Sequence, residues 1–346
     1  MFFYEKITRK ESFYSPADLI ISLFGKSRVG PLGREWESAV SRKSLKIAIL
    51  GAGVFGRYHA MKARAHARVS HVTLYDPQKA KLISLADELK LTAQLDLEAA
   101  INESDAVIIA APAPYHAQLT LKALGAGKHC LIEKPLAHNL EQGRAICDLA
   151  RDKKLNVHVG HQERYVLQAI GLDTILSRPK LIELYRENPF GPRGTDVSVS
   201  LDLTVHDLDM VMWLLGGEPL GVLATGESVR TEFIDRTRAE LLYENSKAVI
   251  HTSRVANEGR RFMRLTYDKG TVEIDFNSRK LKHNTPFMLN EDFTDDPRAR
   301  DALAASDDAF YQAVLHGAPS AIPPEDGLRA LEWAVEIDNL ILGTSL

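Results

Sequence analysis

Three residues in the middle of this 346-residue chain have types and spacings that suit acid–base chemistry. Asp202 and His206 stand four positions apart, so on a helix both side chains would share one face. A neutral imidazole can take a proton from a hydroxyl group, and an aspartate beside it can orient the ring or bind a neighbouring hydroxyl. Lys134 follows a predicted strand, and its ammonium group could stabilise an alkoxide; taken without the motif around it, a solvated surface lysine is the alternative. Together these residues predict proton removal from an alcohol.

Two other interpretations of the Asp202–His206 pair stay open. A histidine in a core can be purely structural, with its ring nitrogens hydrogen-bonded. Asp202, His206 and Asp209 could also hold a zinc ion, although no cysteine or second histidine is close to them in the sequence. The leading prediction is an acid–base pair without a metal, in which Asp207 and Asp209 are ordinary helix residues.

A glycine-rich segment predicts a binding site for a dinucleotide. Residues 51–56 read G-x-G-x-x-G, between a predicted strand at 46–50 and a predicted helix at 55–67. Glycines here permit a tight turn and let the backbone approach a pyrophosphate, while the helix N-terminus supplies unpaired N–H groups. The residues expected at this contact are Gly51, Gly53, Val54, Phe55 and Gly56.

An acidic residue after the next apolar run completes this pattern. Asp76 follows the predicted strand at 72–75 and stands 25 residues after Gly51, close to the spacing of about 20 that is typical of dinucleotide sites. Its carboxylate would accept hydrogen bonds from ribose hydroxyls and repel a 2′-phosphate. Pro77 and Gln78 follow, with no arginine directly behind them. NAD is therefore predicted as the cofactor, in preference to NADP.

The elements that must position these residues alternate between strands and helices in the first half of the chain. Short apolar runs separated by segments of helical periodicity are typical of βαβ units and of a parallel sheet covered on both faces. The predicted strands are residues 46–50, 72–75, 106–111, 129–132 and 157–159. The predicted helices are residues 55–67, 79–89, 116–124 and 140–150. This half is predicted to fold as a doubly wound Rossmann domain.

The second half of the chain has a different rhythm. A helical block at 205–215 carries His206, and the strand-like runs that follow are separated by short turns, which predicts a large, mainly antiparallel open sheet. The predicted strands are residues 221–225, 239–242, 248–253, 263–267 and 271–275. Two helices, near 298–316 and 325–342, end the chain. Because an open sheet has a broad apolar face, a homodimer or homotetramer formed through it is expected.

These patterns divide an α/β protein into three parts. Residues 1–45 are interpreted as an extension with one short helix near 16–24. Residues 46–160 form the NAD-binding domain, and residues 161–346 form an α/β domain for substrate binding and oligomerisation. The last helix could pack back on the NAD-binding domain.

Composition argues against several classes of partner. The formal net charge is −3 and basic residues are scattered, which argues against nucleic acid as a partner. No apolar stretch has the length of a membrane span, and the apolar run at 19–24 is too short for a signal-peptide core. A cytoplasmic protein with a small-molecule substrate is expected.

Four motifs, in order, resemble those of the Gfo/Idh/MocA family, named for glucose-fructose oxidoreductase and inositol dehydrogenase. Residues 111–116 (A-P-A-P-Y-H) resemble its loop after the fourth strand, and residues 125–135 (G-A-G-K-H-C-L-I-E-K-P) resemble its E-K-P signature. Residues 202–209 and 213–216 resemble its D-x-x-x-H-x-x-D and W-L-L-G block. The resemblance runs from about residue 46 to the last helix.

This resemblance implies an NAD(P)-dependent oxidoreductase acting on CH–OH groups, and it assigns roles to individual residues. The additional cofactor contacts that it implies are Pro112, His116, Glu133 and Lys134. The catalytic residues that it implies are Lys134, His206 and Asp202.

Some positions depart from the common family pattern and resemble one branch. Where many members have glycines, this chain has residues 197–200 (V-S-V-S) and Thr204. With the segment 160–165 (G-H-Q-E-R-Y), they resemble the nucleotide-sugar branch, of which UDP-N-acetylglucosamine 3-dehydrogenases are the nearest type. Guanidinium groups bind phosphate with two hydrogen bonds, so arginines are candidates for a substrate diphosphate. The expected substrate contacts are Arg164, Tyr165, Arg186, Arg193, Asp202 and His206.

Three functions remain open at this point. The leading one is oxidation of a secondary hydroxyl of a sugar, including a nucleotide sugar, with NAD as hydride acceptor. The second is an inositol or aldose dehydrogenase with the same machinery. The third is a regulatory protein that binds NAD without turnover, which the presence of Lys134, Asp202 and His206 disfavours.

Overall fold

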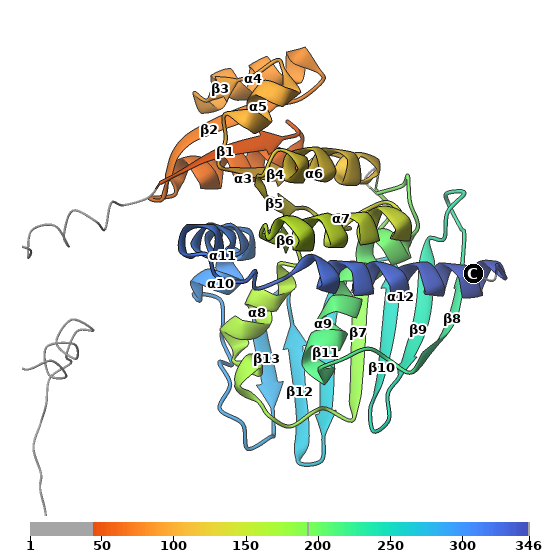
Figure 1. Ribbon diagram of the computed structural model, residues 1–346. Helices are drawn as coiled ribbons and strands as arrows, with labels where there is room; N and C mark the ends of the chain where they lie inside the picture. Colours follow the sequence, from red (N-terminus) through yellow and green to blue (C-terminus); the bar gives the residue numbers. More distant parts are fainter. Residues whose placement is uncertain (1–43, 192–193, 345–346) are drawn as a thin grey trace, which may run out of the picture. The chain divides into compact units, whose positions relative to one another are not determined.

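A parallel sheet of six strands forms the first half of the computed structural model, which describes residues 44–191 and 194–344 (Figure 1). The strand order is β3-β2-β1-β4-β5-β6, and all neighbours are parallel. The strands are β1 (Leu45–Leu50), β2 (Val69–Tyr75), β3 (Thr92–Ala93), β4 (Ala106–Ile109), β5 (His129–Ile132) and β6 (Val157–Val159). The predicted doubly wound sheet is confirmed, and the helix predicted at 16–24 lies outside the described residues.

Both faces of this sheet are buried, which explains why its strands are almost continuously apolar. Along β1, Ile47 and Ile49 belong to one apolar cluster, while Ala48 and Leu50 belong to another on the opposite side. The helices of this half are α3 (Val54–Ala65), α4 (Lys79–Leu89), α5 (Leu97–Asn102), α6 (His116–Gly125) and α7 (Leu140–Lys153). A short 3-10 turn, η1 (Ala113–Tyr115), precedes α6.

A second sheet of seven strands follows, in the order β13-β12-β11-β7-β10-β9-β8. Only the β7–β10 pair is parallel, so the prediction of a mainly antiparallel sheet is confirmed. The strands are β7 (Leu181–Glu187), β8 (Gly221–Glu227), β9 (Arg236–Leu242), β10 (Lys247–Ser253), β11 (Arg260–Tyr267), β12 (Gly270–Asp275) and β13 (Lys280–His283). The central strand β7 was not among the predicted elements. Its inward-facing residues include the buried Arg186, which breaks the expected apolar alternation.

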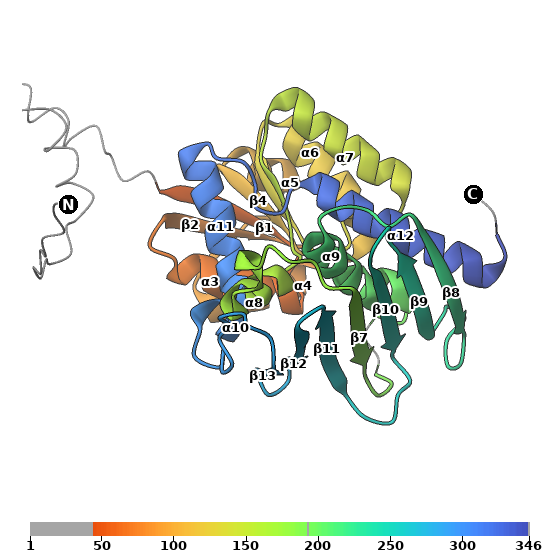
Figure 2. The ribbon, with the colours of Figure 1, turned by 90° about the horizontal axis from the view of Figure 1, so that it is seen from below.

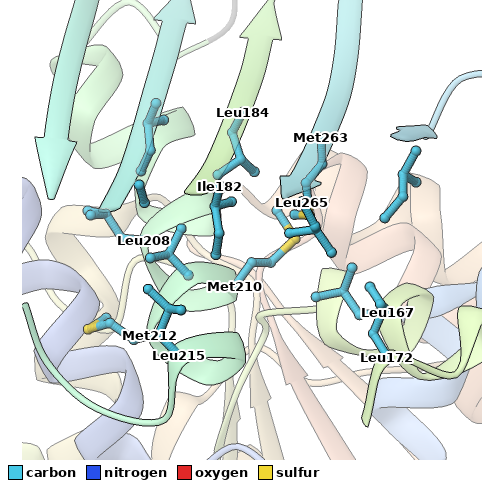
Figure 3. Close-up of a cluster of buried hydrophobic side chains, with 14 of the residues drawn as sticks. Leu167, Leu172, Ile182, Leu184, Leu208, Met210, Met212, Leu215, Met263 and Leu265 are labelled. Atoms are coloured by element: carbon cyan, nitrogen blue, oxygen red, sulfur yellow. The ribbon is translucent and has the colours of Figure 1, made fainter. Parts of the chain in front are cut away.

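Helices cover one face of the second sheet and form its core. They are α8 (Glu163–Ile170), α9 (Val205–Leu215) and α12 (Pro324–Leu342). In Figure 3 the side chains of Leu208 and Met210 on α9 lie against those of Ile182 on β7 and Leu265 on β11. Burying a side chain of this kind stabilises the fold by about 1.5–3 kcal/mol. The packing fixes the position of α9, the helix that carries His206.

The C-terminal helices contact both sheets. Helix α11 (Ala302–His316), which follows the short α10 (Pro297–Arg300), contacts α3 (Figure 2). Its Phe310 and Tyr311 belong to an apolar cluster of the parallel sheet. Helix α12 contacts α7 and β6 on one side, and α9 and β8 on the other. Within residues 44–191 and 194–344, no helix is long and apolar enough to cross a membrane.

Candidate active site

The glycine-rich turn between β1 and α3 has the geometry that its sequence requires. Gly51 has a φ of +119°, which favours glycine, and a Cβ on Gly56 would overlap the carbonyl oxygen of Gly51. Gly53, at the N-cap of α3, has open space where a Cβ would be, and no side chain caps this helix end. The turn therefore leaves a helix N-terminus without a competing side chain, which suits a pyrophosphate.

Asp76 fixes this turn to the end of β2. Its Oδ2 accepts a hydrogen bond from the backbone N of Ala52 at 2.8 Å, and its Oδ1 accepts one from the backbone N of Gln78 at 2.7 Å. A carboxylate has about four acceptor positions, so two remain for ribose hydroxyls. The side chains of Asp76 and Lys81 line the same cavity.

Two overlapping cavities lie along the carboxyl ends of the parallel strands. The first, of about 750 Å³, runs from Asp76 to Lys134, and the second, of about 470 Å³, contains His206. Residues that line both cavities are Phe55, Glu133, Lys134, Gly194 and Asp202. The predicted cofactor contacts that line the first cavity are Gly51, Gly53, Val54, Phe55, Asp76, Pro112, Glu133 and Lys134. Gly56 does not line it, because its role is to let the turn close.

His116 was predicted to touch the cofactor, but the structure places it behind the cavity. It is 1% exposed, and its Nδ1 and Nε2 lie 2.7 Å and 2.8 Å from the carbonyl oxygens of Pro135 and Ala111. Burial lowers the pKa of this imidazole. His116 therefore ties together the two loops that follow β4 and β5, and its place as a direct cofactor contact is corrected.

Lys134 and Asp202 form an ion pair where the two cavities meet. The Nζ of Lys134 donates to the Oδ1 of Asp202 at 2.9 Å and to its carbonyl oxygen at 2.8 Å. Burial raises the pKa of Asp202, but the ammonium of Lys134, with smaller contributions from His206 and Arg254, outweighs this and holds the pKa below its usual range. Asp202 lies in a π-helical turn, η3 (Ser200–Thr204), directly before α9. Its partner is therefore the lysine rather than the histidine.

The histidine has a different acidic partner, which sequence reasoning missed. The Nδ1 of His206 lies 2.8 Å from the Oε2 of Glu163, at the start of α8. Burial opposes ionisation of Glu163, but His206, Arg186 and Arg261 outweigh it and hold its pKa well below the usual range. An ionised carboxylate only accepts hydrogen bonds, so this contact favours the tautomer with the hydrogen on Nδ1, which leaves Nε2 as the nitrogen that can accept a proton.

The arginines predicted to bind a substrate diphosphate form ion pairs in the interior of the protein instead. Arg186 donates to Asp207 from Nε at 3.0 Å and from Nη2 at 2.8 Å. Arg164 pairs with Asp209 through Nε at 2.8 Å and with Asp326 through Nη1 at 2.7 Å. The two arginines and their partners on α9, Asp207 and Asp209, are each at least nine-tenths buried. The predictions that Arg164 and Arg186 bind substrate are therefore wrong, whereas Asp207 and Asp209 lie on α9 as the structural partners of these arginines.

Of the other expected substrate contacts, Tyr165 is also buried. Its Oη lies 3.3 Å from the Nε2 of His158, and it belongs to the core of the parallel sheet. Arg193 lies outside the described residues. Asp202 and His206 do line the second cavity, together with Gln162, Asn188 and Arg254, which sequence reasoning did not select. In the segment 160–165 the sequence predicted Arg164 as a functional residue, whereas the structure brings Glu163, the residue before it, to His206.

Arg254 holds the segment that passes over Asp202. Its Nη1 donates to the carbonyl oxygen of Gly194 and its Nη2 to that of Val197 at 2.5 Å, while Asp235 pairs with its Nε at 3.0 Å. A Cβ on Gly194 would overlap the carboxylate of Asp202, and the φ of Gly194 is +66°. The zinc interpretation finds no geometric support, since Asp209 pairs with Arg164. Over residues 44–191 and 194–344, no group of three or more acidic, histidine or cysteine side chains could hold a metal ion.

Comparison with known protein families matches both halves of the chain. Residues 45–161 match the GFO_IDH_MocA model, described as an oxidoreductase family with an NAD-binding Rossmann fold. Residues 177–273 match the GFO/IDH/MocA C-terminal domain. The two matched segments contain the glycine turn, Lys134, Asp202 and His206.

Individual relatives align over most of the chain. UDP-N-acetylglucosamine 3-dehydrogenase of Acidithiobacillus ferrooxidans is 31% identical over 85% of this chain and 96% of its own length. A crystal structure of that enzyme superposes with a TM-score of 0.80, covering 87% of this chain and 98% of the relative. Inositol 2-dehydrogenase of Rhizobium meliloti is 28% identical over 84% of this chain and 95% of its own length. The chain therefore belongs to the GFO/IDH/MocA family of NAD-binding oxidoreductases, as its motifs predict.

Proposed function

We propose that this protein oxidises a secondary hydroxyl group of a nucleotide sugar, with NAD as the hydride acceptor. The observation that carries the proposal is the meeting of the two cavities. Lys134 and Asp202 line both of them, and the His206–Glu163 pair lines only the second cavity. A substrate in the second cavity would present its carbon to a cofactor in the first.

Separate parts of the first cavity suit separate groups of NAD. The open backbone at Gly53 suits a pyrophosphate, and the acidic side chain of Asp76 suits the adenosine ribose. Lys134 stands at the other end, where the nicotinamide ribose would be expected. When bound, NAD supplies the acceptor for a hydride.

The residues of the chain supply the remaining chemistry. The proposed substrate hydroxyl lies between the Nε2 of His206 and the Nζ of Lys134. Its proton passes to Nε2 as the C–H hydride leaves, and the ammonium of Lys134 stabilises the developing alkoxide. Glu163 then balances the charge of the imidazolium, since its carboxylate lies 2.8 Å from Nδ1. Asp202 holds the ammonium in place and can accept a hydrogen bond from a neighbouring hydroxyl.

The substrate class rests on the relatives and is the finer part of the proposal. The relative at 31% identity acts, by its name, on UDP-N-acetylglucosamine, and it aligns over nearly its whole length. The second candidate is an inositol, favoured by the 28% identity to an inositol 2-dehydrogenase. A regulatory role without turnover is disfavoured, because both the Lys134–Asp202 and the His206–Glu163 pairs are complete.

We also propose that copies of the chain associate through the open face of the second sheet. Tyr185 stacks on His251 with ring centroids 4.6 Å apart, and Arg260 lies 3.6 Å above the Tyr185 ring. Phe262 stands on the other side of Tyr185 in the register. Such an aromatic and arginine-rich face resembles the composition of protein interfaces.

Tyr185→Glu should convert an oligomer into monomers in sedimentation, and a wild-type monomer at micromolar concentration would contradict the proposal. The cytoplasmic location stays a prediction.

Substrate assays test the proposed function directly. UDP-N-acetylglucosamine, free N-acetylglucosamine and myo-inositol are each incubated with the protein and NAD, with hydroxylamine present to trap a ketone. NADH formation is expected with the nucleotide sugar and not with the other two. Turnover of myo-inositol alone would favour the second candidate. No turnover of any sugar, cyclitol or nucleotide sugar, in a protein that binds NAD, would favour the regulatory role.

A further inference from the structure

A buried histidine that the proposed chemistry does not use lies between two carboxylates. His59, on the cofactor helix α3, is 0% exposed. Its Nδ1 lies 2.8 Å from the Oδ1 of Asp307 on α11, and its Nε2 lies 3.0 Å from the Oε1 of Glu133 at the end of β5. Asp307 and Glu133 are 1% and 5% exposed. The three side chains therefore form one continuous chain of hydrogen bonds.

To donate a hydrogen bond to both carboxylates, the His59 ring needs one proton more than a neutral imidazole carries. A neutral ring donates from one nitrogen only, while both of its neighbours here are acceptors when ionised. Burial opposes a charge on His59, but Asp307 and Glu133 outweigh it and raise the pKa of His59 to about 10. The pKa of Glu133 is lowered, since His59 and Lys134 outweigh its burial. Burial raises the pKa of Asp307 above its usual value, so Glu133 is the more acidic of the two carboxylates.

The position of Glu133 links this chain to the active site. Glu133 directly precedes Lys134 and lines both cavities at the place where they overlap. Gln162 also donates to its Oε1, at 3.1 Å, and the backbone at Gly160 packs so closely that a Cβ there would lie 3.3 Å from the carboxylate. His59, Gln162 and the backbone at Gly160 therefore restrict the Glu133 carboxylate at the end of the cofactor cavity that Lys134 lines.

We propose that His59 is a positioning residue, which as an imidazolium clamps Glu133 to Asp307 and thereby sets the place of the Lys134 ammonium. The proposal rests on the proposed function, since it concerns the lysine of that reaction. His59 also connects α3, which begins at the glycine turn, to β5 and α11. One side chain in this way connects the helix that follows the cofactor turn to the residue that directly precedes the lysine.

A matched control is available at the end of the same helix. His66 follows α3, and its Nε2 lies 2.9 Å from the Oδ1 of Asp308, so it also joins this segment to α11. It makes no hydrogen bond to Glu133. Comparing His59→Gln with His66→Gln separates a general loss of packing between α3 and α11 from a loss of the clamp on Glu133.

We expect His59→Gln to lower kcat about tenfold or more, because small displacements of a catalytic group are costly, while the KM for NAD changes less than threefold. His66→Gln should keep kcat within about twofold, because His66 contacts Asp308 and not Glu133. Equal losses of kcat in the two variants, or a fall in NAD affinity that accounts for the whole effect in His59→Gln, would overturn the proposal.

Asp307→Asn tests the charge without removing the imidazole. The amide oxygen can still accept from Nδ1, but with one anion fewer His59 should lose its proton at a lower pH. The other charged groups near the chain are Lys62, which influences Asp307, and Lys134 and His116, which influence Glu133. We expect kcat of Asp307→Asn to decline toward alkaline pH earlier than kcat of the wild type. Identical alkaline limbs would contradict the proposal.

Nuclear magnetic resonance of the histidine-labelled protein keeps the inference separate from the proposed function. The His59 signal, assigned by its loss in His59→Gln, should have the shift of an imidazolium at pH 8. A neutral ring at that pH would overturn the clamp even if the enzyme were active. Absence of dehydrogenase activity together with an imidazolium signal would instead count against the proposed reaction.

Discussion

The cofactor half and the substrate half of the active site are formed by different kinds of group. The cofactor half consists of backbone and closely spaced residues, since the turn at 51–56 and Asp76 lie within one βαβ unit. The substrate half consists of side chains that are distant in sequence. His206 depends on Glu163, which is held by Arg186 and Arg261 from two strands of the other sheet.

The two halves therefore differ in the substitutions that they tolerate. The backbone turn fails when a Cβ is added at Gly51 or Gly56, because it would overlap backbone atoms there. The side-chain half fails when a charge is removed, since truncating one partner of a buried ion pair leaves the other uncompensated, at a cost of about 3–5 kcal/mol. The following predictions test this contrast, from the largest expected effect to the smallest.

Gly56→Ala should abolish measurable NAD binding. The added methyl group would overlap the carbonyl oxygen of Gly51, so the turn cannot close in its present form. Gly53→Ala is the matched control, because a Cβ there meets nothing within 4 Å of protein and Gly53 has a negative φ. Calorimetric titration with NAD measures both variants. Normal binding by Gly56→Ala would mean that the turn is not held by backbone packing.

His206→Asn should lower kcat by about 10² or more and leave the affinity for NAD unchanged, because it removes the proton acceptor but touches only the second cavity. Single-turnover measurements, with the substrate that the assays described above select, separate chemistry from product release. Unchanged turnover, where chemistry limits the rate, would remove His206 from the mechanism.

The cofactor half could be predicted almost completely from the sequence, because its determinants are local. The spacing of the glycines and of Asp76 indicated both the fold and the cavity. Lys134 was selected through the resemblance of residues 125–135 to the E-K-P signature, and it follows β5 of the parallel sheet. His116 was misassigned, because a sequence cannot show that its two nitrogens face backbone carbonyl groups.

The substrate half could be predicted only in part, because its determinants are contacts between distant residues. The helix at 205–215 and the D-x-x-x-H spacing were clear. The partner of His206 was not, since Glu163 is 43 positions away. Arg164 and Arg186 looked like phosphate ligands, yet Asp207 and Asp209 neutralise them inside the core, and only the packing of α9 on β7 and α8 brings these charges together.

Glu163→Gln should lower kcat about tenfold, less than loss of the histidine itself, because the amide keeps a hydrogen-bond acceptor for Nδ1 but not the charge that balances the imidazolium. The pKa of Glu163 lies well below its usual range, so its contribution to stability is present above the unfolded value of about 4.3 and is lost as pH falls through the folded value. Urea unfolding at neutral and acidic pH should therefore show a smaller acid loss in the variant. Equal acid losses would indicate that Glu163 is not ionised in the folded protein.

Asp76→Asn should narrow the preference for NAD over NADP by a few-fold, up to about tenfold or 1.4 kcal/mol. The amide oxygen can keep one of the two backbone hydrogen bonds made at 2.8 Å and 2.7 Å, so the glycine turn should survive while the repulsion of a 2′-phosphate disappears. Lys81 lines the same part of the cavity and would then face the phosphate. Adding Lys81→Ala to Asp76→Asn should reverse part of the gain in NADP affinity. Titration of each variant with both cofactors measures the ratio. A ratio that stays at its wild-type value would show that the carboxylate serves the turn alone, and the selectivity would then have to arise from the backbone of the glycine turn.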